Sequence, residues 1–505
     1  MILSSTEKYI LVVGLGKSGI SASKFFRRKG YEVVATDINP ARKDAPQTLE
    51  LESLGIKTEI GPHNIETFEN AGLIVVSPGI PLDGDHFQKA IKKGIPIRGE
   101  MDIAAELIKE PIVAITGTNG KTTVTTLISE MLKCSGFKVF TGGNIGTPLI
   151  EYLNQTELYE IKGSDKPVIS IDKLKINGAD KSETVKSSGS LIDNRCDVVV
   201  VEVSSFQLDT AQNFSPDVAV LLNITEDHMN RYPDFRAYED SKWSIFSGQN
   251  EKCHAIINSR IQSINTNNSK VAINSHIDIN DLQNSRLANI RAKITLFNTD
   301  EELFTAQKQL SKLKGKHNQE NIEASILAAL CAGASMEGIE SALKSFKGLP
   351  HRIEYVATIN GVEFYNDSKG TNTDATARAI ESFDKKGSFL DNHDSFVKKS
   401  FASNIILIMG GQDKNMDFSV LKEWINGRIK LIVLMGETKD KIYKALAGSC
   451  DMIFADNMKH AVNLSFSHAK SGDTVLLSSA CASFDMYGSY TERGDDFKRQ
   501  VKSLI

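Results

Sequence analysis

No run in the sequence approaches the roughly 18 consecutive apolar residues of a membrane-spanning helix, so we expect no membrane insertion. The formal net charge of −4 leaves no basic excess, which means that nucleic acid is not an electrostatically favoured partner. The six cysteines include no Cys-x-x-Cys pair and no disulfide framework, which favours a reducing compartment. The first residues, "MILSSTEKYILVVGLG", have no basic region before the apolar stretch and predict no signal peptide. We therefore expect a cytoplasmic protein.

What is present is typical of a large α/β protein. A chain of 505 residues is too long for one hydrophobic core, so about two to four domains are expected. Short apolar, β-branched runs ending in Gly, Ser or Asp alternate with helical stretches, as in parallel sheets with crossover helices. Three such blocks follow one another, and we place them at residues 1–107, 108–348 and 349–505.

Three polar stretches interrupt this alternation. They cover about residues 156–192, 260–300 and 384–403, and each is rich in polar residues such as Lys, Ser, Asp or Asn. Because they carry no recognisable chemistry, we expect them to be insertions or surface loops.

The segment "PIVAITGTNGKTTVTTLISEMLK" carries the strongest chemical signal. An apolar strand leads through a glycine-containing loop into a helix, where backbone N–H groups and the positive helix end can hold a phosphate. Lys121 can reach the β and γ phosphates of a nucleotide, and the Thr122 hydroxyl can hold Mg²⁺. Gly117 and Gly120 leave room for a close approach of the backbone. The loop is short, because Ile115 stands where the first glycine is expected, yet an ordinary glycine turn needs no Gly-Lys-Thr.

Two strand ends carry candidate metal ligands. The run "DVVVVEVSSFQL" delivers Glu202 to the carboxyl edge of a sheet, and "NITEDHMNRY" places Asp227 and His228 at a neighbouring edge. A carboxylate suits Mg²⁺, which takes oxygen ligands. A single glutamate at a strand end is usually a cap or an ion pair, and a lone histidine is usually structural. Beside a phosphate loop, the two together favour a metal site.

The segment "GLGKSG" fits the pattern G-x-G-x-x-G, follows a strand, and precedes Asp37 by about twenty residues. This arrangement is typical of a dinucleotide site. The motif alone is a weak signal, since the same loop can hold any diphosphate, and a dehydrogenase would not explain the loop around Lys121.

Seven segments together resemble the Mur ligases of peptidoglycan synthesis. They are "TGTNGKTT", "EVSSFQL", "NITEDHMNRY", "HNQEN", "LPHRIE", "NDSKGTN" and "SSACASFDMYGSYTERG". In that family the short TGTNGKT loop is the ATP loop, so Ile115 is no defect. The combination of TEDHMxRY, NDSKxTN and SxACASFDxY is similar to the D-glutamate-adding members, whereas the DNPR signature of the diaminopimelate-adding members is absent.

The resemblance implies a fold and a reaction. The fold would be a Rossmann-like UDP-binding domain, a central ATPase domain with a mostly parallel sheet, and a C-terminal Rossmann-like domain that brings the amino acid. The enzyme would join D-glutamate to UDP-N-acetylmuramoyl-L-alanine through an acyl phosphate, in cytoplasmic peptidoglycan precursor synthesis. It would use ATP, two Mg²⁺ ions and a carbamylated Lys242, have these small molecules as its partners, and act as a monomer.

The resemblance also assigns residues to the site. One Mg²⁺ would contact Thr122 and Glu202, and the other would contact Glu202, His228 and the Lys242 carbamate. The catalytic residues would be Lys121, Glu202, His228 and Lys242. The ATP-binding residues would be Gly117, Thr118, Asn119, Gly120, Lys121, Thr122, Thr123, Asn318, Asn321, Arg352 and Asp367. The residues around the sugar nucleotide and D-glutamate would be Ser18, Asp37, Asn144, Lys369, Thr371, Lys414, Ser483 and Tyr490.

Some positions depart from the family pattern or allow a simpler interpretation. Asp37 is followed by Ile38 and Asn39, where the D-glutamate-adding enzymes often have a Thr-Arg pair; Arg42 could replace that arginine. Tyr490 stands in place of a more usual Phe. Lys242 on its own would be interpreted as a surface lysine on a helix.

Three other functions remain open at this point. A folylpolyglutamate synthase would share the ATP loop but not a UDP-binding first domain or the "SSACASFDMY" segment. A dehydrogenase would use "GLGKSG" to bind NAD, and its binding of NADH would distinguish it. A nucleotide-dependent scaffold would bind ATP without substrate-dependent phosphate release.

Overall fold

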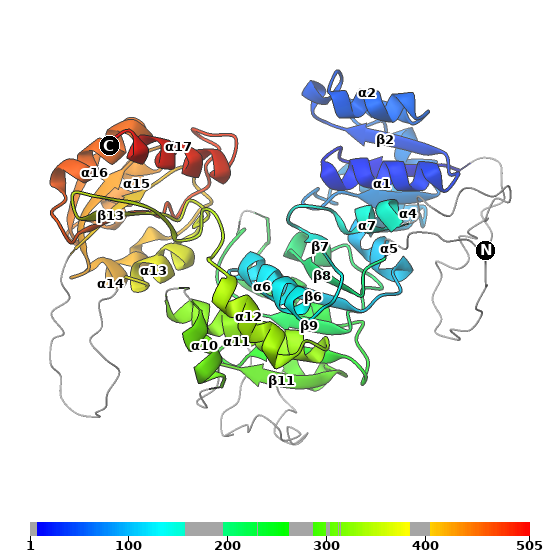
Figure 1. Cartoon of the computed structure of the whole chain (residues 1–505). Helices are drawn as coiled ribbons and strands as arrows, with labels where there is room; N and C mark the ends of the chain where they lie inside the picture. The colour runs from blue at the N-terminus through cyan, green and yellow to red at the C-terminus, as the bar shows by residue number, and fades with distance from the viewer. Residues whose placement is uncertain are drawn as a thin grey trace.

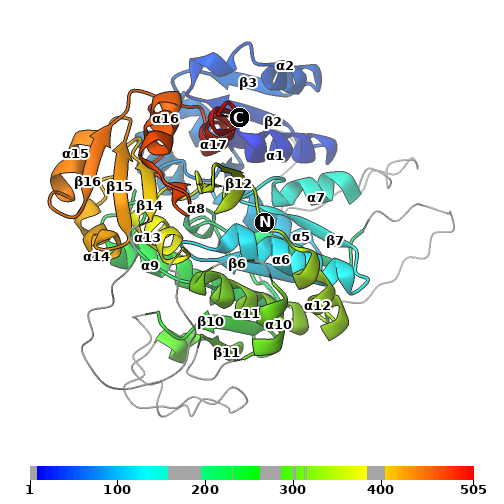
Figure 2. The same ribbon diagram turned by 60° about the vertical axis from the view of Figure 1, so that its left-hand side comes forward.

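The computed structural model describes residues 8–156, 195–229, 231–261, 286–298, 303–311, 313, 315–383 and 404–504. The polar stretches at 156–192, apart from Thr156, and at 384–403 lie outside these residues. Figure 1 shows three α/β units that follow one another along the chain, with the central unit joined to both others. Figure 2 gives a second view of the same arrangement.

The first unit is a parallel sheet in the order β3-β2-β1-β4-β5. Its middle strand, "ILVV", is buried along its whole length, as a parallel sheet covered on both faces requires. The segment "GLGKSG" therefore begins at the carboxyl edge of the middle strand. The elements are β1 (Ile10–Val13), α1 (Lys17–Arg28), β2 (Val33–Asp37), α2 (Pro46–Ser53), β3 (Lys57–Ile60), α3 (Ile65–Glu69), β4 (Leu73–Val76), α4 (Asp85–Lys92) and β5 (Ile97–Gly99). Helix α5 (Glu100–Leu107) leads into the second unit.

The second unit is a six-stranded parallel sheet in the order β11-β10-β9-β6-β8-β7. Strand β6 lies between β9 and β8, so the loop that follows it lies where ligands bind in such sheets. The elements are β6 (Ile112–Thr116), α6 (Lys121–Cys134), β7 (Val139–Gly143), α7 (Leu149–Thr156), β8 (Val198–Glu202), α8 (Ser205–Leu208), β9 (Val218–Leu221), α9 (Phe235–Trp243), β10 (His254–Asn258), β11 (Lys293–Phe297), α10 (Thr305–Leu310), α11 (Lys316–Cys331) and α12 (Met336–Ser345).

The third unit is a six-stranded sheet in the order β12-β13-β17-β14-β15-β16, in which only the β12–β13 pairing is antiparallel. Its elements are β12 (Glu354–Ile359), β13 (Val362–Asn366), α13 (Thr373–Glu381), β14 (Ile405–Met409), α14 (Lys422–Ile425), β15 (Ile429–Leu434), α15 (Lys439–Ala445), β16 (Asp451–Phe454), α16 (Met458–His468), β17 (Thr474–Leu477) and α17 (Tyr490–Lys502). The three sheets confirm the predicted α/β class.

The first two units share one continuous hydrophobic core. It runs from the side chains of β1 and α1 through α5 and α7 to those of β6 and β8. Helix α7 belongs to the second unit by sequence but packs on α1 and α5. The apolar clusters of the third unit, in contrast, contain only residues from 353 onward. The first pair of units is therefore joined by apolar packing, and the third unit has cores of its own.

The prediction of a surface insertion at 260–300 is wrong at its end. Residues Lys293–Phe297 form β11, an edge strand that pairs in parallel with β10. The apolar run "ITLF" is short and follows an Asn-rich sequence, so it was not recognised as a strand. No helix in the described ranges is long and apolar enough to cross a membrane.

Candidate active site

The loop between β6 and α6 has the geometry of a phosphate-binding loop. Gly120 has φ +87° and precedes the first turn of α6, and a Cβ there would lie 2.4 Å from Asn321 Oδ1. Asn223, just after β9, holds the loop from the side: Asn119 N donates to Asn223 Oδ1 (2.8 Å), and Asn223 Nδ2 donates to Asn119 O (3.0 Å). The backbone at the start of α6 is thus fixed and open to an anion.

Two lysines, the partly buried Lys121 and the buried Lys242, converge on this loop. Lys121 Nζ donates to the carbonyl oxygens of Gly117 (2.7 Å) and Thr118 (2.8 Å). Lys242 Nζ, from α9, donates to the same Gly117 oxygen (3.0 Å) and lies 4.6 Å from the centre of the Tyr238 ring. Lys242 is only 2% exposed, so it is not a surface lysine. Burial and the neighbouring Lys121 charge lower the pKa of Lys242 well below its usual value.

Glu202, at the end of β8, is the centre of a second cluster. Thr122 Oγ1 donates to Glu202 Oε2 (2.8 Å), and Asn144 Nδ2 donates to Glu202 Oε1 (3.0 Å). Arg352, from the third unit, donates through Nη2 to Thr122 Oγ1 (2.8 Å). A buried carboxylate, a hydroxyl and an amide therefore lie together beside the phosphate loop.

The segment after β9 contributes a different carboxylate, that of Asp227. It accepts hydrogen bonds from Lys414 Nζ (3.4 Å) and Asn372 Nδ2 (3.2 Å), both from the third unit. His228 Nε2 lies 3.8 Å from Asp227 Oδ2, and burial and nearby lysines lower the pKa of this imidazole. Burial opposes ionisation of Asp227, but the Lys414 and His228 charges, the hydrogen bond from Asn372 and the Lys121 charge together outweigh it and lower the pKa of the carboxyl. His228 thus faces Asp227. In the described part of the chain it forms no hydrogen bond or ion pair with Glu202.

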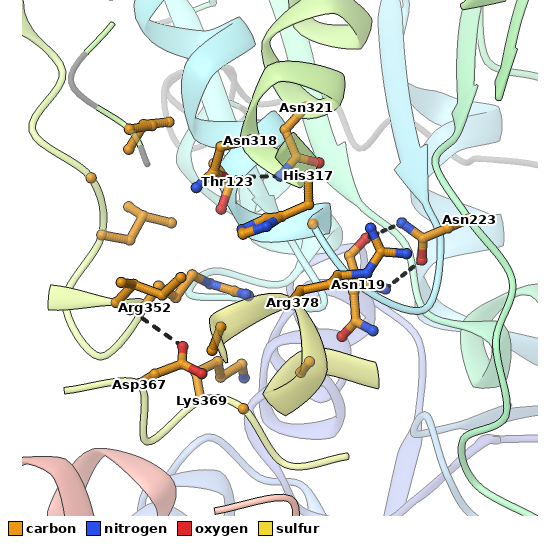
Figure 3. Close-up of a pocket in the computed structure, with 18 residues that line it drawn as sticks. Asn119, Thr123, Asn223, His317, Asn318, Asn321, Arg352, Asp367, Lys369 and Arg378 are labelled. Carbon is orange, nitrogen blue, oxygen red and sulfur yellow. Dashed lines mark hydrogen bonds between the residues drawn. The ribbon is translucent and has the colours of Figure 1, made fainter. Parts of the chain in front are cut away.

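A pocket lies between the second and third units (Figure 3). From one side it is lined by the ATP loop and by His317, Asn318 and Asn321 of α11. From the other side it is lined by residues of the third unit, namely Arg352, Asp367, Lys369 and Arg378. Burial lowers the pKa of His317 to about 4, and burial raises that of Asp367 to about 7.

Two of the residues assigned to D-glutamate lie in contact. Lys369 Nζ is 3.9 Å from the centre of the Tyr490 ring, and burial, followed by the charge of Arg352, lowers its pKa to about 8. Ser483 is buried in the segment after β17, where its carbonyl oxygen accepts from Tyr487 N (2.8 Å). Thr371 is partly buried one residue before Asn372.

In the first unit, Ser18 and Asp37 both lie at the loop "GLGKSG". Asp37 accepts from Leu15 N (2.7 Å) and so fixes this loop. Ser18 Oγ donates to Glu100 Oε1 (3.2 Å), while Glu100 Oε2 accepts from Ile150 N (3.1 Å) in α7. Glu100 is buried, and burial raises its pKa to about 7. The loop is therefore tied through Glu100 to the second unit.

The donors around Glu202 suit Mg²⁺. This ion is usually held by one or two carboxylates together with substrate phosphates, and it keeps several waters. Thr122 and Glu202 provide a hydroxyl and a carboxylate beside the phosphate loop. A closed cage of three or more His, Cys, Asp and Glu side chains is absent from the part of the chain that the structure describes. The arrangement therefore fits an ion that shares its ligands with a nucleotide.

Comparison with known proteins covers nearly the whole chain. Residues 8–99 match the Mur ligase MurD-like N-terminal domain, residues 115–329 the Mur ligase middle domain, and residues 351–481 the Mur ligase glutamate ligase domain. The chain belongs to the Mur ligase family. The UDP-N-acetylmuramoylalanine–D-glutamate ligase of Desulfosudis oleivorans is 40% identical over 99% of this chain and 98% of its own. That of Desulfatibacillum aliphaticivorans is 38% identical over 98% of both chains.

Solved structures show the same fold. MurF ligase from Thermotoga maritima, in complex with ADP, aligns over 94% of this chain and 96% of its own with a TM-score of 0.53 and 14% identity. MurC from the same organism aligns over 98% and 100% with a TM-score of 0.51 and 14% identity. The three-unit architecture is therefore that of a Mur ligase.

The structure brings eight of the assigned residues to the two sides of one pocket, but their roles stay predictions. These are Asn119, Gly120, Thr123, Asn318, Asn321, Arg352, Asp367 and Lys369. Sequence reasoning assigned no role to Asn223, Glu100, Asp374 or Arg378. Asn223 stands within the quoted "NITEDH" segment, and its position after β9 was the available signal. Glu100, Asp374 and Arg378 act through contacts between units, which no local pattern reveals.

Proposed function

We propose that this chain is an ATP-dependent ligase that joins D-glutamate to UDP-N-acetylmuramoyl-L-alanine in peptidoglycan precursor synthesis. The observation that carries the proposal is identity of 40% over nearly the full length to an enzyme of that name, together with the Mur ligase domains in order. The ATP loop and Lys369 line one pocket, and Lys414 pairs with Asp227 of the second unit, which supports a single reaction site between the two units. Because one chain supplies both sides of the cleft, we also propose a monomer, with domain boundaries near 108 and 348.

The chemistry that the site supports is activation of a carboxylate. A carboxylate does not form an amide in water without activation, so the γ-phosphoryl group of ATP passes first to the L-alanyl carboxylate. Such a transfer depends mainly on positioning and charge neutralisation. Lys121 now donates to the Gly117 and Thr118 carbonyl oxygens of its own loop. When ATP binds, its ammonium group would exchange these oxygens for those of the β and γ phosphates. The amine of D-glutamate then attacks the acyl phosphate, and phosphate leaves.

D-glutamate is held, in this proposal, by cations of the third unit. Its two carboxylates need two anchors, and Lys414 and Lys369 supply them. Thr371 lies two residues after Lys369, and Tyr490, at the start of α17, lies against Lys369. Ser483 lies in the segment between β17 and α17. Lys414 now pairs with Asp227, so it would exchange this carboxylate for that of the substrate. At the other end of the cleft, Ser18, Asp37 and Asn144 would face the sugar nucleotide.

The proposed cofactors follow the same geometry. Thr122 and Glu202 would hold one Mg²⁺, and Glu202, His228 and a carbamylated Lys242 a second; bound ions would neutralise charge on the phosphates. Carbon dioxide reacts only with a neutral amine, and burial beside Lys121 lowers the pKa of Lys242 and favours that form. Enzyme depleted of CO₂ should gain activity when bicarbonate is added. Equal activity with and without bicarbonate, with no mass increase on Lys242, would exclude the carbamate.

Phosphate release with different amino acids tests the function. Purified enzyme is given ATP, Mg²⁺ and UDP-N-acetylmuramoyl-L-alanine with D-glutamate, L-alanine, L-lysine or diaminopimelate. Only D-glutamate should give rapid release. L-alanine and L-lysine have one carboxylate each and would leave one cation of the site unpaired, whereas diaminopimelate has two carboxylates but is longer and brings a second amine toward Lys369 and Lys414. Faster release with another amino acid would contradict the substrate but not the ligase family. Binding of NADH in place of ATP would favour the dehydrogenase.

A further inference from the structure

The third unit touches the second through a small set of polar contacts around the ATP loop. Among the described residues these are Arg352 with Thr122, Asn372 and Lys414 with Asp227, Asp374 with Asn119, and Arg378 with Glu320. The apolar clusters of the third unit include no residue of the second. The position of the third unit over the cleft therefore depends on polar contacts and not on a shared core.

Two of these contacts use groups that the reaction needs. Arg352 and Thr122 line the phosphate site, and Lys414 is the proposed anchor of D-glutamate. These side chains must change partners when substrates bind, so their present contacts cannot hold the third unit throughout the reaction.

The contacts made by helix α13 are different, because neither Asp374 nor Glu320 is assigned to a substrate. Their partner on the loop is Asn119, which is assigned to ATP. Asn119 Nδ2 donates to Asp374 Oδ2 at 2.6 Å. Arg378, one turn later, donates through Nε to the same oxygen (3.0 Å) and lies 3.8 Å from Glu320 on α11. Figure 3 shows Arg378 and Asn119 side by side in the pocket. One carboxylate thus joins a residue of the ATP loop to an arginine of the third unit.

Residues at both ends of α13 lie close to the second unit. Asp374 lies in the first turn, after the cap Asn372, whose side chain accepts from Ala375 N (2.8 Å). At the other end, the Ser382 hydroxyl lies so close to Gly315 that a Cβ on this glycine would be 2.3 Å from it. The first turn of α13 therefore approaches the ATP loop, and the residue after its last turn approaches the start of α11.

We propose that Asp374 is a positioning residue, which docks α13 on the ATP loop through Asn119 and holds Arg378 toward α11. Asn223 fixes the backbone of Asn119 on both sides, so the loop presents a rigid docking point. The segment from Asn366 to Asn372 connects β13 to α13 and carries Lys369. Docking of α13 thereby sets the distance between Lys369 and the ATP loop, and thus between the amino acid and the acyl phosphate.

Kinetics of Asp374→Ala test this role. We expect kcat for ligation to fall about tenfold or more, as loss of a charge-assisted hydrogen bond implies, while the Kd for ATP changes less than about threefold. Asp374→Asn keeps an oxygen that accepts from Asn119 and should recover part of the loss. Glu130→Ala, which removes an exposed ion pair with Lys133 on α6, is the matched control and should behave as wild type. Equal kcat in Asp374→Ala and wild type would overturn the proposal.

A double-mutant cycle separates docking from a general structural effect. If Asn119 and Asp374 act through their mutual hydrogen bond, the double alanine variant should lose no more kcat than the worse single variant. Losses that multiply would overturn the proposal.

Small-angle X-ray scattering gives a readout without the reaction. This matters because the kinetic tests rest on the proposed function. Asp374→Ala without ligands should have a larger radius of gyration than wild type and Glu130→Ala, since α13 no longer holds the third unit. If all three proteins have the same radius, the docking role is wrong even when D-glutamate is the substrate. If the wild-type enzyme does not ligate D-glutamate but Asp374→Ala has the larger radius of gyration, the proposed function is wrong and the docking role of Asp374 is supported.

Discussion

At the scale of single residues, the carbonyl oxygen of Gly117 is shared by two ammonium groups. Lys121 and Lys242 both donate to it, at 2.7 and 3.0 Å; Lys242 is buried and Lys121 is partly buried. Two like charges at one acceptor repel each other, which adds to the effect of burial and lowers the pKa of Lys242. The pair is relieved when Lys121 moves to a nucleotide phosphate or when Lys242 becomes neutral.

Lys414→Ala should weaken D-glutamate binding and leave ATP binding nearly unchanged. Removing a charged partner of a carboxylate costs about 1.5–3 kcal/mol, which corresponds to a rise of KM by about 10- to 100-fold. Steady-state kinetics with each substrate varied in turn measure both constants. Lys441→Ala is the control, because Lys441 forms a partly exposed ion pair with the neighbouring Asp413. A KM for D-glutamate equal in both variants would show that Lys414 is not the anchor.

Glu100→Gln should change how stability depends on pH. Burial raises the pKa of Glu100 from 4.5 to about 7, so between these values the folded protein binds more protons than the unfolded chain. This group therefore makes wild type less stable as pH rises through that window, by at most about 1.4 kcal/mol per pH unit. The glutamine variant lacks this term, and its melting temperature relative to wild type should rise from pH 5 to pH 8. A constant difference across that range would contradict the shift.

At the scale of secondary-structure elements, helices α7 and α13 connect the units in two different ways. α7 inserts between α1 and α5 and completes an apolar core. Its Asn154 is buried, accepts from Arg28 through both its side-chain and its backbone oxygen, and donates to Ser21 O (3.1 Å). α13, in contrast, uses charged side chains at a surface that lines the nucleotide pocket.

Asn154→Ala should destabilise the joint between the first two units without touching the chemistry. Loss of buried hydrogen-bond partners costs about 1–3 kcal/mol, or roughly 2–10 °C in melting temperature for units of this size. Gln155→Ala, at the exposed neighbouring position, should change little. Melting curves give the first value, and kcat at 25 °C, expected to match wild type, gives the second. Equal melting temperatures for the two variants would show that the α1–α7 contact contributes nothing.

The elements that the sequence predicts well are those with a continuous apolar run or a recognisable residue pattern at one end. The run "VVVV" before Glu202 and the loop-to-helix transition at Lys121 both lie where the sequence places them. In α11, Leu330 is 37% exposed, because the packing of neighbouring elements decides which face of the helix is buried. Strand β11 escaped prediction since it is a short edge strand after a polar stretch. Burial of Lys242 follows from tertiary packing, which a helical period cannot show.

At the scale of the whole molecule, the first two units are joined by a shared apolar core, whereas the third unit is attached through polar contacts. The first and second units share a core, so the loop "GLGKSG" and the ATP loop keep a fixed relation. The third unit, which carries Lys369 and Lys414, rests on the second through polar contacts that substrates can replace. In the proposed reaction, this arrangement would let the third unit bring the amino acid to an acyl phosphate formed at the other two units.

The fate of the carboxylate oxygens is the most direct test of this account. UDP-N-acetylmuramoyl-L-alanine labelled with ¹⁸O in its free carboxylate is incubated with the enzyme, ATP, Mg²⁺ and D-glutamate, and phosphate and product are weighed by mass spectrometry. If the carboxylate is phosphorylated and then attacked by the amine, one ¹⁸O atom leaves in the phosphate and the other remains in a product heavier by one glutamate residue. Unlabelled phosphate, or no product containing D-glutamate, would contradict the account.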